Sequence, residues 1–176
     1  MILGRRAVLA EVLRGLGDAP KKVACAGPPA LCLVLARAGH TVLAWGLQVR
    51  RLASARRRSQ KGGTWAIVRA QGGALPVRDG ELDAVVYAGA LPANAEAIVA
   101  EWERVVRDGG RVVIASSVKP GLWARLRARL GGVRLRPLAP QDYTRLMLLG
   151  GFTDVRQVWP RRSIVITAAR VRKIPG

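Results

Sequence analysis

Short apolar runs alternate with segments of helical periodicity along nearly the whole chain, and this alternation restricts the fold more than any other feature. Glycine or proline bounds most of the runs, which is typical of buried strands. Strands that alternate with helices are joined by right-handed crossovers and form a mainly parallel sheet with helices on both faces. The expected strands are residues 22–27, 41–45, 64–68, 82–87, 111–116, 153–158 and 163–169. The expected helices are residues 1–17, 30–38, 47–58, 94–106, 122–130 and 140–149. Asp108-Gly109-Gly110 is expected to form the turn that leads into the strand 111–116.

The last two expected strands are separated only by the four residues 159–162, so they form a hairpin-like pair. This pair places an antiparallel strand at one edge of the sheet. The chain has 176 residues, a length that suits one domain with a real hydrophobic core. We therefore predict a single α/β domain, residues 1–176, with helices on both faces of a seven-stranded sheet.

Net charge is the abnormal part of the composition. Thirty Lys and Arg stand against eleven Asp and Glu, which gives +19 at pH 7. Residues 1–70 carry 13 basic and 2 acidic side chains, residues 71–108 carry 3 and 7, and residues 109–176 carry 14 and 2. Two basic flanks thus enclose an acidic middle, and the excess favours binding to polyanions such as nucleic acid.

The cysteines and the histidine point to no metal or redox site. Cys25 and Cys32, the only cysteines, fit neither a CxxC pair nor a zinc knuckle, and their apolar surroundings predict reduced core residues of a cytosolic protein. His40, the only histidine, lies in the turn RAGHT and is expected at the surface. We predict no metal site from this inventory.

The first expected helix is interrupted by charged residues, so it lacks the apolar core of a signal peptide or a membrane-spanning helix. Its apolar residues repeat at helical spacing and predict a buried stripe. We expect a cytoplasmic protein, with the nucleoid or the ribosome as candidate places of association. The stripe residues are Ile2, Val8, Leu9, Val12, Leu13 and Leu16.

Three phrases follow one another along the chain: ALPVRDGELDAVVYAGAL at 74–91, EWERVVRDGGRVVIAS at 101–116 and LAPQDYTRLMLLGGFTDVRQV at 138–158. The first resembles the "LP, acidic turn, FD, strand" segment of the class I S-adenosylmethionine methyltransferase family. The second resembles the "E-R-V-L-x-P-G-G" helix and strand of that family, and the third its late helix and "GF-x-x-V" strand. The resemblance covers nearly the whole chain and implies a Rossmann-like sheet with strand order 3-2-1-4-5-7-6.

The sequence departs from the family where the cofactor binds. In the family, the first strand ends in an acidic residue and a glycine-rich turn, because backbone must approach the cofactor closely. The matching stretch is VACAGPPAL at 23–31, in which Val23 or Cys25 stands at the acidic position and Gly27 is the only glycine. Pro28 and Pro29 remove two N–H donors and fix two φ angles, so the turn is stiff where the family keeps it open.

Two further acidic positions are lost. Gly46 matches the acid that accepts hydrogen bonds from the ribose hydroxyls, and Gln71 matches the acid that contacts adenine in many members. A hydrogen bond to a charged group contributes about 1.5–3 kcal/mol, so loss of the ribose acid alone weakens binding about 10–150-fold. We therefore predict no cofactor and no catalytic residue. The degenerate positions are Cys25, Gly27, Pro28, Pro29, Gly46 and Gln71.

The leading functional hypothesis is a non-catalytic, methyltransferase-like protein that binds DNA or RNA with little sequence preference through arginine-rich surfaces. Arginine suits phosphate because its planar guanidinium can donate two hydrogen bonds to one group. The chain carries no base-reading motif such as a zinc finger or an RNP sequence. The candidate contacts are Arg50, Arg51, Arg56, Arg57, Arg58, Lys61, Arg125, Arg127, Arg129, Arg134, Arg136, Arg161, Arg162, Arg170, Arg172 and Lys173.

Other functions remain open on the sequence alone. An active methyltransferase, acting on nucleic acid, is compatible if substitute residues hold S-adenosylmethionine. A pseudoenzyme scaffold that binds a protein partner or a second copy of the chain is favoured if an apolar patch surrounds two exposed tryptophans. A different nucleotide is also compatible, because Arg50 and Arg51 follow the lost ribose acid and an arginine at that place accommodates a 2′-phosphate in dinucleotide folds. The tryptophans at element ends are Trp65, Trp102, Trp123 and Trp159.

Overall fold

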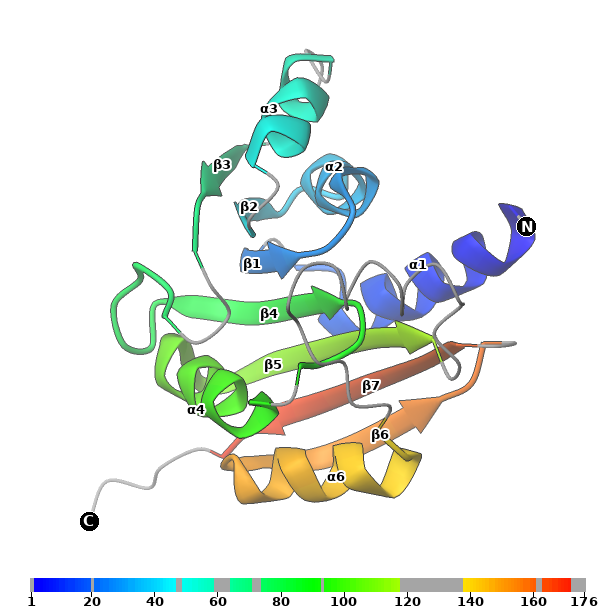
Figure 1. Cartoon of the computed structure of the whole chain (residues 1–176), viewed down its shortest axis with the longest axis vertical. Coiled ribbons are helices and arrows are strands. Elements are labelled where there is room, and N and C mark those ends of the chain that lie inside the picture. The colour runs from blue at the N-terminus through cyan, green and yellow to red at the C-terminus, as the bar shows by residue number, and fades with distance from the viewer. Residues whose placement is uncertain are drawn as a thin grey trace.

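One seven-stranded sheet forms the centre of the computed structural model, with the strand order β3-β2-β1-β4-β5-β7-β6 (Figure 1). The structure describes residues 2–19, 21–46, 49–58, 64–70, 74–92, 94–117, 138–160 and 163–171. Strands β1 to β5 pair in parallel, whereas β7 runs antiparallel to both β5 and β6. The predicted fold class and strand order are therefore confirmed, with the hairpin of β6 and β7 at one edge.

The described elements match the predicted ones apart from their ends, with β5 as the exception. The predicted helix 122–130 lies outside the described residues. The strands are β1 (Lys22–Ala26), β2 (Thr41–Trp45), β3 (Trp65–Val68), β4 (Leu82–Ala88), β5 (Val106–Ser117), β6 (Phe152–Val158) and β7 (Ser163–Arg170). The described helices are α1 (Ile2–Leu16), α2 (Pro29–Arg37), α3 (Val49–Arg58), α4 (Ala95–Val105) and α6 (Pro140–Leu149).

Strand β5 begins earlier than the sequence predicts, because the expected turn at 108–110 is an irregularity within the strand. Val106 pairs with Leu82 and Arg111 with Ala84, so the register shifts between the two pairs. Gly109 has a φ of +73° and supplies the left-handed backbone that this bulge requires. A Cβ on Gly110 would lie 2.5 Å from Val106 Cγ1 and 2.8 Å from the Asp83 carbonyl oxygen, so the bulge also depends on a second glycine.

The helices cover the two faces of the sheet and enclose two hydrophobic clusters. Helices α1, α2 and α3 pack on the face that carries Val23 and Val86. Helices α4 and α6 pack on the opposite face, around Trp102 and Met147. The predicted stripe of α1 is confirmed where its side chains are described, and no described helix is long and apolar enough to cross a membrane.

Cys25, Cys32 and His40 lie in the core. Cys25 and Cys32 are both buried and carry no disulfide, and the burial matches the prediction. The predicted surface location of His40 is wrong, because this residue is only 3% exposed. The chain turns back into the protein after α2, and the His40 N–H donates to the Leu35 carbonyl oxygen at 3.2 Å. Burial, followed by the charge of Lys21, lowers the pKa of His40 and favours the neutral ring.

Candidate functional site

The carboxyl ends of β1, β2 and β4 define the place where a ligand is expected. The chain leaves β1 for β2 on one side, whereas β4 lies on the other side of β1. In open α/β sheets, ligands bind outside the strand ends at such a switch point. Gly27, Gly46 and Gly89 follow the three strands directly. The candidate site is therefore bordered by backbone rather than by large side chains at these positions.

The first loop offers little to a polar cofactor. Cys25 is fully buried beneath α2, and its sulfur lies 3.5 Å from the sulfur of Cys32. This thiol contact and burial raise the pKa of Cys25 well above its usual value, so Cys25 is an uncharged core group and not a substitute for an acid. A Cβ on Gly27 would lie only 2.9 Å from Ala88 Cβ, so the loop packs closely against the end of β4.

The two prolines determine how α2 begins. Pro28 is the extended residue before the helix, with φ −64° and ψ 144°, and Pro29 is the first helical residue. Neither has an N–H, and the Leu31 N–H already donates to the Pro28 carbonyl oxygen at 2.9 Å. The first turn of α2 therefore presents fewer donors to an anion than an ordinary helix start.

Gly46, which the sequence analysis matched to the family's ribose-binding acid, directly follows β2. Gly46 has a φ of +148°, a conformation that side-chain-bearing residues rarely adopt, and a Cβ there would meet no atom of the described residues within 4 Å. The described residues therefore leave the place of a Cβ at Gly46 open. Gln71, the third degenerate position, lies outside the described residues.

Helix α3 follows β2 and presents the basic surface that the structure describes. It lies at the outer end of the molecule, beyond α2 and β3 (Figure 1). Leu52 is 3% exposed and attaches α3 to the core. The described arginine side chains of α3 are exposed. We call these side chains the α3 arginines: Arg50, Arg51, Arg56 and Arg57.

Two hollows flank α3. The first has a volume of about 320 Å³ and is lined by Pro29, Arg50, Arg51 and Ser54. The second has a volume of about 540 Å³ and is lined by Ala53, Arg56, Arg57 and Ile67. No carboxylate belongs to the described lining of either hollow. The α3 arginines therefore form two pairs, one on the side of α2 and one on the side of β3.

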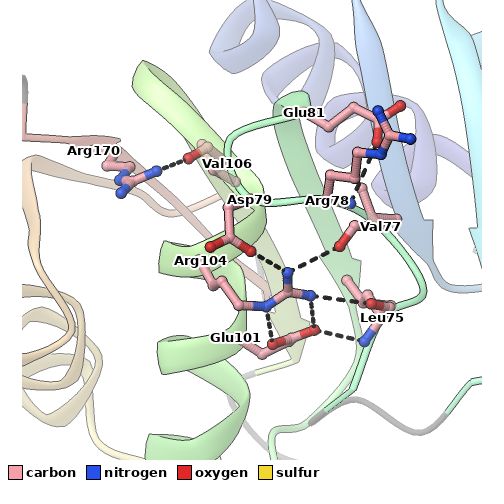
Figure 2. A network of polar contacts seen from close by, with 9 residues as sticks. All are labelled: Leu75, Val77, Arg78, Asp79, Glu81, Glu101, Arg104, Val106 and Arg170. Carbon is pink, nitrogen blue, oxygen red and sulfur yellow. Dashed lines mark hydrogen bonds and ion pairs between the residues drawn. The ribbon is translucent and has the colours of Figure 1, made fainter.

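A polar network fixes the loop before β4 against α4 (Figure 2). Arg104 donates to both carboxylate oxygens of Glu101, at 2.7 and 2.9 Å, and to Asp79 at 2.5 Å. It also donates to the carbonyl oxygens of Val77 at 2.9 Å and Leu75 at 3.1 Å, while the Leu75 N–H donates to Glu101 at 2.6 Å. The hydrogen bonds with Arg104 lower the pKa of Glu101 and keep it ionised.

The acidic middle of the chain is largely used within the fold. Arg170 has a side chain that is only 11% exposed, and it pairs with Glu103 at 2.9 Å and with Asp108 at 3.5 Å. It also donates to the Val106 carbonyl oxygen. Arg170, predicted as a nucleic-acid contact, is thus corrected to an internal ion-pair partner, because β7 places it beside acids that the chain supplies more than sixty residues earlier.

The remaining predicted contacts cannot be placed. The side chain of Arg58 lies outside the described part of α3, although its backbone belongs to the helix. The following predicted contacts lie outside the described residues: Lys61, Arg125, Arg127, Arg129, Arg134, Arg136, Arg161, Arg162, Arg172 and Lys173.

The aromatic and hydroxyl groups near the ends of β4 and β5 are paired with the protein itself. The Tyr87 hydroxyl donates to the Ala90 carbonyl oxygen at 3.1 Å, and the Tyr143 hydroxyl donates to Ser116 Oγ at 3.1 Å. Burial raises the pKa of both tyrosines, so both stay protonated. The Tyr143–Ser116 pair escaped the sequence analysis, because it joins residues from distant elements.

The described tryptophans do not form one exposed patch. Trp65 and Trp102 are buried, whereas Trp159 is 47% exposed. Trp123 lies outside the described residues. Within the described ranges, no group of three His, Cys, Asp or Glu side chains could hold a metal ion.

Comparison with known proteins identifies this architecture. The family model described as "Methyltransferase domain" matches residues 22–114, which include β1 to β4 and most of β5. Comparison with curated proteins by sequence gives no match.

Solved structures of methyltransferases share the fold. Geranyl diphosphate C-methyltransferase from Streptomyces coelicolor A3(2), in complex with Mg²⁺, geranyl diphosphate and S-adenosyl-L-homocysteine, has a TM-score of 0.75 at 15% identity, over 95% of this chain and 79% of that chain. An S-adenosylmethionine-dependent methyltransferase from Mesorhizobium loti has a TM-score of 0.74 at 15% identity, over 95% and 98%. Magnesium protoporphyrin IX methyltransferase from Synechocystis PCC 6803, with bound SAH, has a TM-score of 0.69 at 16% identity, over 96% and 84%.

Proposed function

The chain belongs to the methyltransferase domain family. We propose that it is a member that has lost S-adenosylmethionine binding. We further propose that it binds nucleic acid through its basic surface. The observation that carries this proposal is at the end of β2. Where the family places an acid for the ribose hydroxyls, this chain has Gly46, and the next helix presents the α3 arginines instead. We infer that a negatively charged group, which accepts hydrogen bonds from a ribose, has been replaced in this region by positively charged groups, which attract anions.

The loss of cofactor binding follows from the groups that border the site. Cys25 is an uncharged thiol held against Cys32, and Gly46 has no side chain, so neither position supplies a carboxylate. Each missing charge-assisted hydrogen bond costs about 1.5–3 kcal/mol of binding free energy. The two losses together weaken binding by about 10²–10⁴-fold, if their contributions add.

The gain of polyanion binding follows from α3. Its arginines lie on both sides of an exposed helix at the outer end of the molecule (Figure 1). Four guanidinium groups that neutralise four phosphates release about four counterions, so log affinity falls with log salt concentration with a slope of about −3 to −4 from α3 alone. Contacts to phosphate carry no sequence information, so we expect similar affinity for unrelated sequences.

The test is a salt-dependent titration of fluorescently labelled DNA and RNA strands, followed by anisotropy, between about 50 and 200 mM salt. The double variant Arg50→Ala/Arg57→Ala should reduce the slope by about two units and weaken binding to every sequence alike. The matched control is Arg145→Ala/Arg156→Ala, which removes the same charge from α6 and β6 and should leave the slope within about half a unit of the unmodified protein. Equal slopes for the two double variants would refute the assignment to α3.

A second candidate is an active methyltransferase that acts on nucleic acid. The backbone at Gly46 favours it, because no described atom lies within 4 Å of a Cβ there and a ligand could approach the end of β2 closely. S-adenosyl-L-homocysteine is bound in the Streptomyces coelicolor and Synechocystis structures, according to their descriptions. Methyl transfer from labelled S-adenosylmethionine to a bound strand would replace the leading proposal with this one.

A further inference from the structure

We propose that the hollow between α2 and α3, lined by Pro29, Arg50, Arg51 and Ser54, is a binding site for a terminal phosphate group, a phosphate monoester. The ligand is a nucleoside monophosphate or the phosphorylated end of a nucleic-acid strand, which share this group. The second source rests on the nucleic-acid binding proposed above, whereas the first does not.

The hollow brings together polar groups that the fold holds on one side of a helix. Residues 50 and 54 are separated by one helical turn, so Arg50 and Ser54 lie on the same stripe of α3. Leu52 is buried on the other side and fixes the rotation of α3, so this stripe cannot turn inward. Pro29, at the start of α2, forms the apolar part of the lining of this open hollow.

The donors in this hollow are side chains rather than backbone. Pro28 and Pro29 have no N–H groups, and the Leu31 N–H is already used, so the start of α2 supplies little. The Arg50 guanidinium carries five N–H donors, and the Ser54 hydroxyl adds one more. Arg51 adds a second positive charge to the lining. The described lining has no carboxylate that would compete with an anion. The volume of about 320 Å³ is at the small end of the range for ligand sites.

The number and charge of the donors favour a monoester over the diester of a continuous strand. A phosphate monoester has three acceptor oxygens and a charge near −2 at neutral pH, because its second pKa is about 6. A diester has one negative charge and two non-bridging oxygens, so it uses fewer donors of the hollow. Binding should therefore strengthen between about pH 5.5 and 7.5, as the monoester loses its second proton.

The experiment compares ligands that differ only in the terminal phosphate. A labelled strand with a 5′-phosphate and the same strand with a 5′-hydroxyl are titrated by anisotropy. AMP and adenosine are titrated by calorimetry in parallel. We expect the 5′-phosphate to increase strand affinity about fivefold. It adds one charge-assisted contact, and solvent weakens that contact because the arginines are exposed. We expect AMP to bind and adenosine not to bind.

Two variants separate this hollow from the rest of α3. Arg50→Ala/Ser54→Ala should abolish AMP binding and bring the ratio of the two strand affinities to about one. Arg57→Ala, on the side of the second hollow, should weaken both strands equally and leave the ratio unchanged. Circular dichroism of each variant checks that the fold is retained.

Each outcome distinguishes the two proposals. A phosphate preference without AMP binding supports the site with the strand end as its ligand, and AMP binding without strand binding supports the site while nucleic-acid binding fails. Strand binding with no 5′-phosphate preference and no AMP binding overturns the site and leaves the proposed function standing. Absence of both overturns both.

Discussion

Replacement of Arg104 by methionine tests the network that fixes the loop before β4 against α4 (Figure 2). Methionine retains much of the aliphatic chain and removes the guanidinium. The carbonyl oxygens of Leu75 and Val77 each lose a hydrogen bond, worth about 0.5–1.5 kcal/mol. Arg104 also loses two hydrogen bonds to Glu101, whose side chain is 11% exposed. These bonds contribute about 1–2 kcal/mol, because solvent screens part of their strength at an Arg104 side chain that is 35% exposed.

The contact with Asp79 contributes little, because the Asp79 side chain is 81% exposed. Water replaces part of what is lost, so we expect Arg104→Met to lower the free energy of unfolding by about 2–3 kcal/mol. For a chain of this size, that change lowers Tm by roughly 5–10 °C. Urea unfolding followed by circular dichroism measures the free energy, and a thermal scan measures Tm.

The matched control is Arg107→Met. Arg107 is 61% exposed and makes one ion pair with Asp83, so its loss should cost less than about 1 kcal/mol. If Arg104→Met and Arg107→Met had equal stability, the reasoning from the number of buried partners would be refuted.

The same variant makes a prediction about pH. The folded-state pKa of Glu101 is lowered, chiefly by the hydrogen bonds with Arg104, so its contribution is complete above the unfolded pKa of about 4.3. That contribution is lost as pH falls from about 4.3 through the folded pKa. Unfolding free energies measured across this acidic window should depend less on pH in Arg104→Met than in the unmodified protein, and an unchanged pH dependence would contradict the assignment.

Three other substitutions test separate parts of the fold. Gly110→Ala should destabilise by about 2 kcal/mol or more in urea unfolding, because its Cβ would lie 2.5 Å from Val106 Cγ1 and 2.8 Å from two carbonyl oxygens; wild-type stability would refute the tight bulge. His40 is buried with a lowered pKa, so the unmodified protein should lose stability as pH falls from about 6.5 through the folded pKa; His40→Gln should flatten that slope, and an unchanged slope would count against it. Tyr143→Phe leaves Ser116 Oγ without its tyrosine partner and should cost about 1–2 kcal/mol in chemical unfolding, whereas a neutral result would indicate that the hydrogen bond contributes nothing net.

The strand order could be predicted because buried parallel strands leave a local signature. VACA and VLAW are continuous apolar runs, and both lie in interior strands, β1 and β2, close to the expected bounds. The Asp108-Gly109-Gly110 sequence was misread because a turn and a β-bulge use the same chemistry, namely glycine with a positive φ. His40 was misplaced because its burial depends on how the chain returns after α2, which no local pattern encodes.

The candidate site was predictable only in its local part. The missing acids at Cys25 and Gly46 are visible in the sequence, and so is the basic character of α3. The partners of Arg170 were not visible, because Asp108 on β5 and Glu103 on α4 lie beside it only after β7 has paired with β5 and α4 has packed on the sheet. The spacing of Glu101 and Arg104 indicates a helical pair, but nothing local predicts that Arg104 also holds the carbonyl oxygens of Leu75 and Val77.

The most direct test of the account is a calorimetric titration of the protein, freed of nucleic acid, with S-adenosylmethionine. Without a carboxylate at Cys25 or Gly46, we predict no saturable binding at low micromolar concentrations and a Kd about 10²–10⁴-fold above that of a family member that keeps both acids. A Kd in the low micromolar range would contradict the loss of cofactor binding and would favour the active methyltransferase.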